Sequence, residues 1–313
     1  MPQRGIMGVS MGIMLTEWDS IKTEERNERT AQIDTLSTLE MVRLINDEDK
    51  KVAYAVEREL EQIARAVDVI AEQLKKGGRL VYVGCGTSGR LGILDAVECP
   101  PTYSTDPGMV VGLIAGGYPA IFQAVEGAED DIELGVQDLK DLNFNSDDVL
   151  VGIAASGRTP YVVGAMTYAK ELGAHVISIT CSSQSALEQV AEIPIVCSPG
   201  PEVVTGSTRM KSGTAQKMVL NMLSTGAMIK LGKVYGNLMV DVKSSNEKLI
   251  HRCERIVCSA TGVNTQTAIA ALEKCGYHPK VAIVMLQKGV DAETAEALLR
   301  KADGHIAEAL KEV

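Results

Sequence analysis

Short apolar runs that alternate with helical stretches constrain the fold of this chain more than any other feature. Between residues 79 and 197 these runs are rich in Val, Ile and Leu and carry few polar side chains. Strands buried on both faces have this composition, and they occur in parallel sheets that helices cover on both sides. The sequence therefore predicts an α/β fold with a three-layer parallel sheet, whose strands lie at 79–84, 109–114, 148–154, 175–180 and 193–197.

Helical periodicity is found between and after these runs. Residues 118–141 and 160–173 predict helices that connect strands, the second with Pro160 in its first turn. A longer apolar helix is expected at 212–232, where Gly232 ends it. Helices in these places would cover the sheet.

The chain before the first strand predicts a helical arm at 23–78. Ser37 followed by Glu40 forms a capping box, and apolar residues then recur with helical spacing until Gly77. We expect this arm to pack on its own domain or on a second subunit. Residues 1–22 are expected to form a poorly ordered N-terminal extension.

The pattern changes again after residue 236, where short amphipathic segments follow one another. The segments are separated by Gly, which is typical of helix ends, and by Asn or Asp, which are typical of helix starts. We expect 237–313 to form a connector and a small helical C-terminal subdomain that serves packing or dimerisation. Its predicted helices lie at 247–260, 264–275 and 291–312, with a fourth at 280–288.

The chain is acidic and poor in aromatic residues. Its 31 Lys and Arg against 41 Asp and Glu give a net charge of −10, and 4% of its residues are aromatic. No global positive field draws such a chain to a nucleic-acid backbone, and few rings are available to stack on bases. We expect no nucleic-acid partner, although helix starts can bind a small anion even in an acidic protein.

Neither a membrane partner nor a metal is expected. No apolar run reaches the roughly 18 residues that a membrane span requires, and the first residues lack the apolar core of a secretory signal. We therefore expect a cytoplasmic protein. The 7 Cys are scattered, mostly in apolar stretches, which predicts buried reduced thiols, and no Cys or His pair has metal-ligand spacing.

Two segments repeat one design, in which a strand is followed by small residues, Ser-Gly-Arg and a helix. They are VYVGCGTSGR at 81–90 and LVGIAASGRTP at 150–160. Each offers hydroxyl groups, a glycine for close backbone approach and the free amides of a helix start, which favour a phosphate or another anion. Open α/β sheets usually bind ligands at this edge. The candidate binding residues are Gly86, Thr87, Ser88, Ser156, Gly157 and Thr159.

The same residues fit two alternatives to an anion site. The first turn also matches the dinucleotide pattern GxGxxG, but that fold needs an acidic residue at the end of the second strand. This strand ends in Ala115-Gly116-Gly117, and the nearest acid, Asp106, precedes it, so we expect no nicotinamide cofactor. The other alternative is that both turns are tight connections in which Gly and Ser serve only geometry and capping.

Glu98 is the first candidate for acid/base chemistry. The helix after the first turn is expected to stop before Pro100, because residues that precede proline are pushed out of the helical region. Glu98 would then lie at a helix C-terminus, with Asp95 three residues back on the same face, and both effects would raise its pKa. A carboxylate of this kind near a phosphate turn can act as a general acid or base, unless it is an ordinary solvated side chain.

A second acidic cluster, AVEGAEDDIE, is expected early in the helix after the second strand. The helix dipole alone accounts for acids in such a place, although one of them can face the crevice. The cluster contains Glu126, Glu129, Asp130, Asp131 and Glu133. Lys211 and Arg209, further along, fit either a site for developing charge or helix-start salt bridges.

Longer strings resemble a known family in order and almost throughout the chain. They include GCGTSGRLGILDAVECPPTY, AVEGAED, GIAASGRTPYV, EVVTGSTRMKSGTAQKMVLNMLST and GKVYGNLMVDV. From about residue 23 to the C-terminus the sequence is similar to N-acetylmuramic acid 6-phosphate etherases, which have the sugar isomerase (SIS) fold. The resemblance implies an SIS sugar-phosphate-binding domain at 79–236.

The resemblance also implies an activity. It implies a lyase that cleaves the D-lactyl ether of N-acetylmuramate 6-phosphate, giving N-acetylglucosamine 6-phosphate and D-lactate in cell-wall amino-sugar catabolism. The implied partner is a small-molecule sugar phosphate, with no metal or organic cofactor, and the implied assembly is a homodimer with sites near the subunit interface. The glutamate of DAVECPP is Glu98 and the second glutamate of AVEGAED is Glu129, so both carry over as catalytic acid/base groups.

Two other functions remain open. An aldose–ketose isomerase of sugar phosphates needs the same proton abstraction without ether cleavage. A non-catalytic sugar-phosphate sensor would be expected to lack one or both of Glu98 and Glu129, and both are present.

Overall fold

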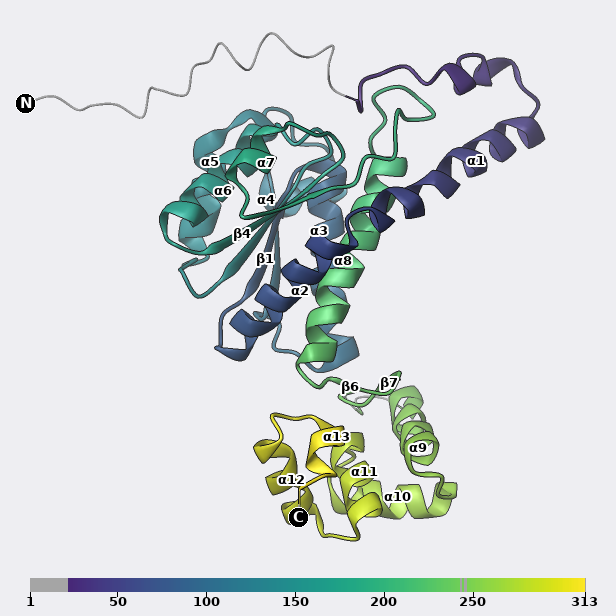
Figure 1. Ribbon diagram of the computed structural model, residues 1–313, viewed down its shortest axis with the longest axis vertical. Coiled ribbons are helices and arrows are strands. Elements are labelled where there is room, and N and C mark those ends of the chain that lie inside the picture. Colours follow the sequence, from purple (N-terminus) through teal and green to yellow (C-terminus); the bar gives the residue numbers. More distant parts are fainter. Residues whose placement is uncertain (1–21, 243, 245–246, 313) are drawn as a thin grey trace, which may run out of the picture.

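The computed structural model describes residues 22–242, 244 and 247–312, and its centre is a parallel sheet covered by helices (Figure 1). The sheet has five strands in the order β2-β1-β3-β4-β5. Each predicted strand is confirmed to within one residue at either end. Residues 1–21 of the predicted extension lie outside the described residues. The strands are β1 (Leu80–Gly84), β2 (Val110–Ile114), β3 (Val149–Ile153), β4 (His175–Thr180) and β5 (Ile193–Val196).

Alternate side chains of the strands build two cores, one on each face of the sheet. Tyr82 and Val151 point to the first core, and Val83 and Leu150 to the second. Every residue of β1 and β3 is buried, which explains their apolar composition. The first core is covered by α1 (Thr38–Glu57), α2 (Leu60–Lys75), α3 (Gly86–Tyr103) and α8 (Lys211–Lys230), and the second by α5 (Ile132–Asp141), α6 (Pro160–Glu171) and α7 (Ala186–Val190).

The predicted helical arm packs on its own chain. The capping box of Ser37 and Glu40 is confirmed at the start of α1, and two short 3-10 helices, Glu28–Thr30 and Ile33–Thr35, precede it. The arm is two helices rather than one, because α1 ends before Arg58 and α2 begins after Glu59. Both helices run along α8, so segments far apart in sequence lie side by side (Figure 1).

Two predicted helix boundaries are wrong. α3 does not stop before Pro100 but continues through both prolines to Tyr103, where Ser104 adopts a left-handed conformation and donates its N–H to Pro100 O. The predicted helix at 118–141 is interrupted, because Gly127 has a φ of +76°. It consists of α4 (Gly117–Phe122), a 3-10 turn (Ala128–Asp130) and α5.

The C-terminal helices share a core of their own, in which Val257, Leu272 and Ile283 are buried. The predicted segment 280–288 is a helix, and 291–312 contains two helices instead of one. A short antiparallel hairpin of β6 (Val234–Tyr235) and β7 (Leu238–Met239) joins this group to the end of α8 (Figure 1). The helices are α9 (Glu247–Thr261), α10 (Thr265–Lys274), α11 (Pro279–Lys288), α12 (Ala292–Lys301) and α13 (Ile306–Ala309). Among the described residues, no helix has both the length and the apolarity to cross a membrane.

Candidate functional site

The two Ser-Gly-Arg turns lie at the same edge of the sheet. They follow β1 and β3, which are neighbouring parallel strands whose last residues, Gly84 and Ile153, are paired. The carboxyl ends of parallel strands meet at one edge, so the starts of α3 and α6 both face it. The structure therefore brings the two predicted binding turns together.

The first turn presents the start of α3 without a side-chain cap. Gly86, Thr87 and Ser88 occupy its first three positions, where backbone N–H groups have no partner within a helix. The N–H of Gly89 is the first to bond backward, to Cys85 O at 3.2 Å. This helix start has the geometry for an anion.

The side chains of the first turn face α8. Ser88 is buried, and its Oγ donates to Oε1 of Gln216 at 2.9 Å. The methyl of Thr87 lies against Gly213, where an added Cβ would be only 3.3 Å from it. Gln216 was not among the residues predicted from sequence. The first two helical turns of α8 therefore pack against the first binding turn.

The second turn is held by its own backbone. Ser156 Oγ accepts a hydrogen bond from the N–H of Arg158 at 3.3 Å. Gly157 has a φ of +67°, and a Cβ there would lie 2.4 Å from the side chain of Ser185, so both the conformation and the space demand glycine. Thr159 is the N-cap of α6, and its hydroxyl makes no capping bond.

The two arginines of the repeat have different surroundings. Arg90 donates its Nε to Ile121 O at 2.9 Å and so ties α3 to α4. The Nε of Arg158 is buried without a hydrogen-bond partner among the described residues. The glycine of the first repeat, Gly89, packs against β1, since a Cβ there would lie 2.7 Å from Gly84 O. It serves packing of α3 on the strand rather than close approach of a ligand.

Glu98 is an exposed side chain within α3, so its predicted place at a helix C-terminus is wrong. Asp95 points inward, where it accepts hydrogen bonds from Tyr82 Oη at 2.8 Å and Ser224 Oγ at 3.0 Å. Burial raises the pKa of Asp95. Ten residues of helix place Glu98 about 15 Å along α3 from Ser88.

Glu129 is exposed in the 3-10 turn that precedes α5, not within a helix as predicted. This 3-10 turn packs against α6, the helix that follows the second binding turn. The pKa of the Cys85 thiol is raised to about 12, chiefly by burial and then by the charge of Glu129. Because Cys85 is the residue before Gly86, Glu129 is the candidate carboxylate on the phosphate side of the site.

A buried charge cluster fixes the start of α8. Glu202 accepts the N–H groups of Lys211 and Ser212, each at 2.9 Å, and thereby caps the helix. The ammonium of Lys211 donates to Glu48 of α1 at 2.8 Å, and both side chains are 1% exposed. Of the two predictions for Lys211, the structure supports the helix-start salt bridge.

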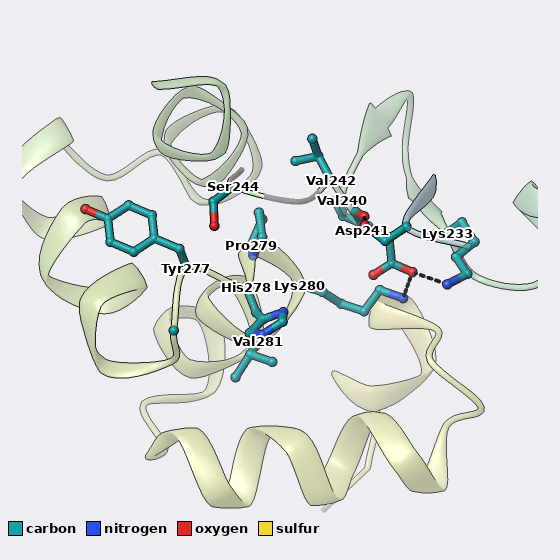
Figure 2. Close-up of a pocket in the computed structure, with 12 residues that line it drawn as sticks. Lys233, Val240, Asp241, Val242, Ser244, Tyr277, His278, Pro279, Lys280 and Val281 are labelled. Atoms are coloured by element: carbon teal, nitrogen blue, oxygen red, sulfur yellow. Dashed lines mark hydrogen bonds and ion pairs between the residues drawn. The ribbon is translucent and has the colours of Figure 1, made fainter. Parts of the chain in front are cut away.

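A cavity of about 580 Å³ lies elsewhere, between the connector and the start of α11. Lys233 and Lys280 both point to Asp241, at 3.0 and 2.9 Å (Figure 2). Ser104 lines this cavity at the end of α3, about 24 Å along the helix from Ser88. The cavity is therefore separate from the two turns.

Within the part of the chain that the structure describes, no cluster of three His, Cys, Asp or Glu residues could hold a metal ion. Five of the cysteines, namely Cys99, Cys181, Cys197, Cys253 and Cys275, are buried, and Cys85 and Cys258 are partly exposed.

Comparison with family models identifies the sheet region. Residues 62–170 match the glucokinase regulatory protein N-terminal SIS domain, and residues 131–226 match the SIS domain. These matches and the observed parallel sheet confirm the predicted fold class. A solved phosphoheptose isomerase from Francisella tularensis superposes with a TM-score of 0.47 at 19% identity, covering 61% of this chain and 98% of that one.

Whole-length relatives are much more similar. The chain is 61% identical to an N-acetylmuramic acid 6-phosphate etherase of Photorhabdus laumondii subsp. laumondii, covering 92% of this chain and 96% of the relative. It is 58% identical to the protein of the same name from Clostridium beijerinckii, covering 94% of this chain and 97% of the relative.

Proposed function

Because this chain belongs to the N-acetylmuramic acid 6-phosphate etherase family, we propose that it cleaves the D-lactyl ether of N-acetylmuramate 6-phosphate. The observation that carries the proposal is the high identity over nearly the whole length of both proteins. The products are N-acetylglucosamine 6-phosphate and D-lactate.

The two turns bind the phosphate in this proposal. The start of α3 supplies unpaired amides at Gly86, Thr87 and Ser88, and the neighbouring turn adds Ser156, Gly157 and Thr159. A phosphate monoester carries two negative charges, which favour a helix N-terminus. An unphosphorylated sugar would lose this anchor.

The chemistry needs carboxylates as acid and base. In the ring-opened sugar, C2 is adjacent to the C1 aldehyde, so a carboxylate can remove the C2 proton while the C3–O bond to lactate breaks and C2=C3 forms. Protonation of the leaving oxygen by an acid completes the elimination. Water then adds across the double bond, with its hydroxyl on C3 and a proton on C2. Each positioned acid/base group contributes about 10²–10⁴-fold to the rate.

We assign these roles to Glu98 as the principal acid/base and to Glu129 as the assisting group. The 3-10 turn that carries Glu129 packs against α6, the helix that follows the second binding turn, which supports its assignment to the site of its own chain. Glu98 is about 15 Å along α3 from Ser88, too far for a sugar held at that turn by its phosphate. The complete site therefore combines the turns and Glu129 of one copy with Glu98 of a second copy.

Exposed apolar side chains on α3 and α4 support this homodimer. Leu94 and Val97, the helical neighbours of Glu98, are 44% and 59% exposed, and Tyr118 and Phe122 of α4, which is tied to the start of α3 through Arg90, are 75% and 74% exposed. Contiguous exposed apolar patches mark association surfaces. The proposed enzyme is a cytoplasmic homodimer.

The decisive experiment measures D-lactate released from N-acetylmuramate 6-phosphate, with the unphosphorylated sugar in parallel. Release from the phosphorylated sugar alone is the expected result, and a ketose product without lactate would favour the isomerase instead. Glu98→Gln should lower the rate at least 10²-fold. Glu293→Gln, at an exposed glutamate of α12, is the matched control.

Subunit mixing tests the shared site. Glu98→Gln and Ser88→Ala are each expected to be nearly inactive alone. After the two variants are unfolded and refolded together, mixed dimers contain one site with both residues intact, so part of the activity returns. If no activity returns although mixed dimers form, the site is not shared between copies.

A further inference from the structure

Gln216 carries an unpaired polar atom directly behind the first turn. The side chain is 1% exposed, and its Oε1 accepts a hydrogen bond from the Ser88 hydroxyl. Its Nε2 is buried and has no hydrogen-bond partner among the described residues. Buried polar atoms are almost always paired in folded proteins, and an unpaired one is destabilising. The position of Gln216 on α8 therefore requires an explanation beyond packing.

The hydrogen-bonding capacity of the Ser88 hydroxyl supplies an explanation for the position of Gln216. Ser88 Oγ has one proton and can accept further hydrogen bonds, so it can satisfy only one end of the Gln216 amide by donation. An anion at the start of α3 needs donors, and Ser88 is one of the first three residues there. To donate a hydrogen bond to the anion, the Ser88 O–H group must turn away from Gln216 Oε1.

Rotation of the Gln216 side-chain amide would then restore the hydrogen bond between Gln216 and Ser88, with donor and acceptor exchanged. Nε2 would donate to Ser88 Oγ, while Oγ donates to the anion. The atom that is unpaired in the free protein gains a partner, and a hydroxyl that accepts one hydrogen bond donates a stronger one. Oε1 loses its hydrogen bond in this exchange, but the charge-assisted bond to the anion is the stronger interaction.

Resting on the etherase function proposed above, we propose that Gln216 is a positioning residue for the substrate phosphate. It changes from acceptor to donor toward Ser88 when a phosphate monoester occupies the first turn. Gln216 does not contact the phosphate itself and acts through the Ser88 hydroxyl.

The test uses inorganic phosphate as the probe and calorimetric titration of the full-length protein. Gln216→Met keeps the shape of the side chain and removes both polar atoms, and Gln216→Glu keeps the acceptor and removes the donor. Both should weaken phosphate binding by about tenfold, the worth of one ordinary hydrogen bond. The KM for the phosphorylated substrate should rise by a similar factor while kcat changes little. Gln73→Met, at a buried glutamine of α2, is the matched control and should leave phosphate binding unchanged.

A double substitution separates positioning from general structural damage. In a Ser88→Ala background, Gln216→Met should cause no further loss of phosphate affinity, because its effect passes through Ser88. Without phosphate, Gln216→Met should melt no lower than the wild type, since it removes the unpaired Nε2. Additive losses, or full phosphate affinity in both single Gln216 variants, would overturn the proposal. Absence of lactate release from the wild type would instead overturn the etherase function and leave this result intact, because phosphate binding is measured without turnover.

Discussion

Replacement of Glu48 by Gln should destabilise the protein strongly and in a pH-dependent manner. Glu48 is 1% exposed and pairs with Lys211 at 2.8 Å, and with Arg29 and Lys51 at 2.6 Å each. Burial alone would raise the pKa of Glu48, but hydrogen bonds from Lys211 and Lys51 outweigh it and lower the pKa from 4.5 to about 2.

The magnitude follows from this shift. A change from 4.5 to about 2 corresponds to about 3 kcal/mol of the free energy of unfolding. Because the pKa is lower in the folded state, this contribution is complete above about pH 4.5 and is lost as the pH falls toward 2. Glu48→Gln also leaves the Lys211 ammonium buried without its carboxylate, and loss of one partner of a buried pair costs about 3–5 kcal/mol. The expected loss at pH 7 is therefore about 3–5 kcal/mol.

Urea denaturation followed by circular dichroism at pH 7 and at pH 3 measures the effect. The difference between wild type and Glu48→Gln should be smaller at pH 3. Glu72→Gln is the control, because the Glu72–Lys76 pair is exposed at 66% and 55% and should contribute less than about 1 kcal/mol. A loss below 1 kcal/mol for Glu48→Gln at pH 7, or the same loss at both pH values, would refute the reasoning.

Two other predictions concern the sheet and the thiols. Gly152→Ala in β3 should lower the free energy of unfolding by about 1–3 kcal/mol, because its Cβ would lie 2.2 Å from Met166 Sδ. The control Gly108→Ala, where no atom lies within 4 Å of the added Cβ, should leave the free energy of unfolding unchanged. Equal melting temperatures of the two variants would contradict this prediction. In the native protein at pH 8, iodoacetamide should modify the partly exposed Cys258 and spare Cys197, whose pKa burial raises to about 12. Mass spectrometry measures both, and early labelling of Cys197 would show the reasoning to be wrong.

The strands could be predicted from sequence because apolar side chains surround them on both faces of the sheet. A strand covered on both faces needs apolar side chains at every position, and this requirement leaves the same mark on β1 and β3. The two binding turns were predictable for a related reason, since each joins a buried strand to a helix start with a fixed pattern of small residues. Local patterns of this kind can be read without knowing the partner elements.

The end of α3 shows where local rules fail. Pro100 and Pro101 lack the N–H groups that would extend the helix ladder, yet α3 packs against β2 and α8 strongly enough to continue through them. The break before α5 was within reach of sequence reasoning, because Gly127 is the residue that adopts the left-handed conformation there.

Partners far apart in the sequence could not be predicted. Ser88 meets Gln216 across 128 positions, and Glu48 meets Lys211 across 163. A glutamine inside an apolar helix and a glutamate inside an amphipathic one look like ordinary surface residues until the helices are packed together. Glu98 was a candidate from its place before Pro100, and the resemblance singled out Glu129 within the acidic cluster, but the length of α3 between Ser88 and Glu98 emerged only from the structure.

The packing of the arm on α8 also has a consequence for biosynthesis. α1 and α2 leave the ribosome first, but α8, the helix that covers them, is completed only at Lys230. At 5–20 residues per second, roughly eight to thirty seconds separate the synthesis of α2 from the completion of α8. During this interval the faces of α1 and α2 that pack on α8 lack that helix as a partner, and apolar surface exposed in this way favours chaperone binding and aggregation.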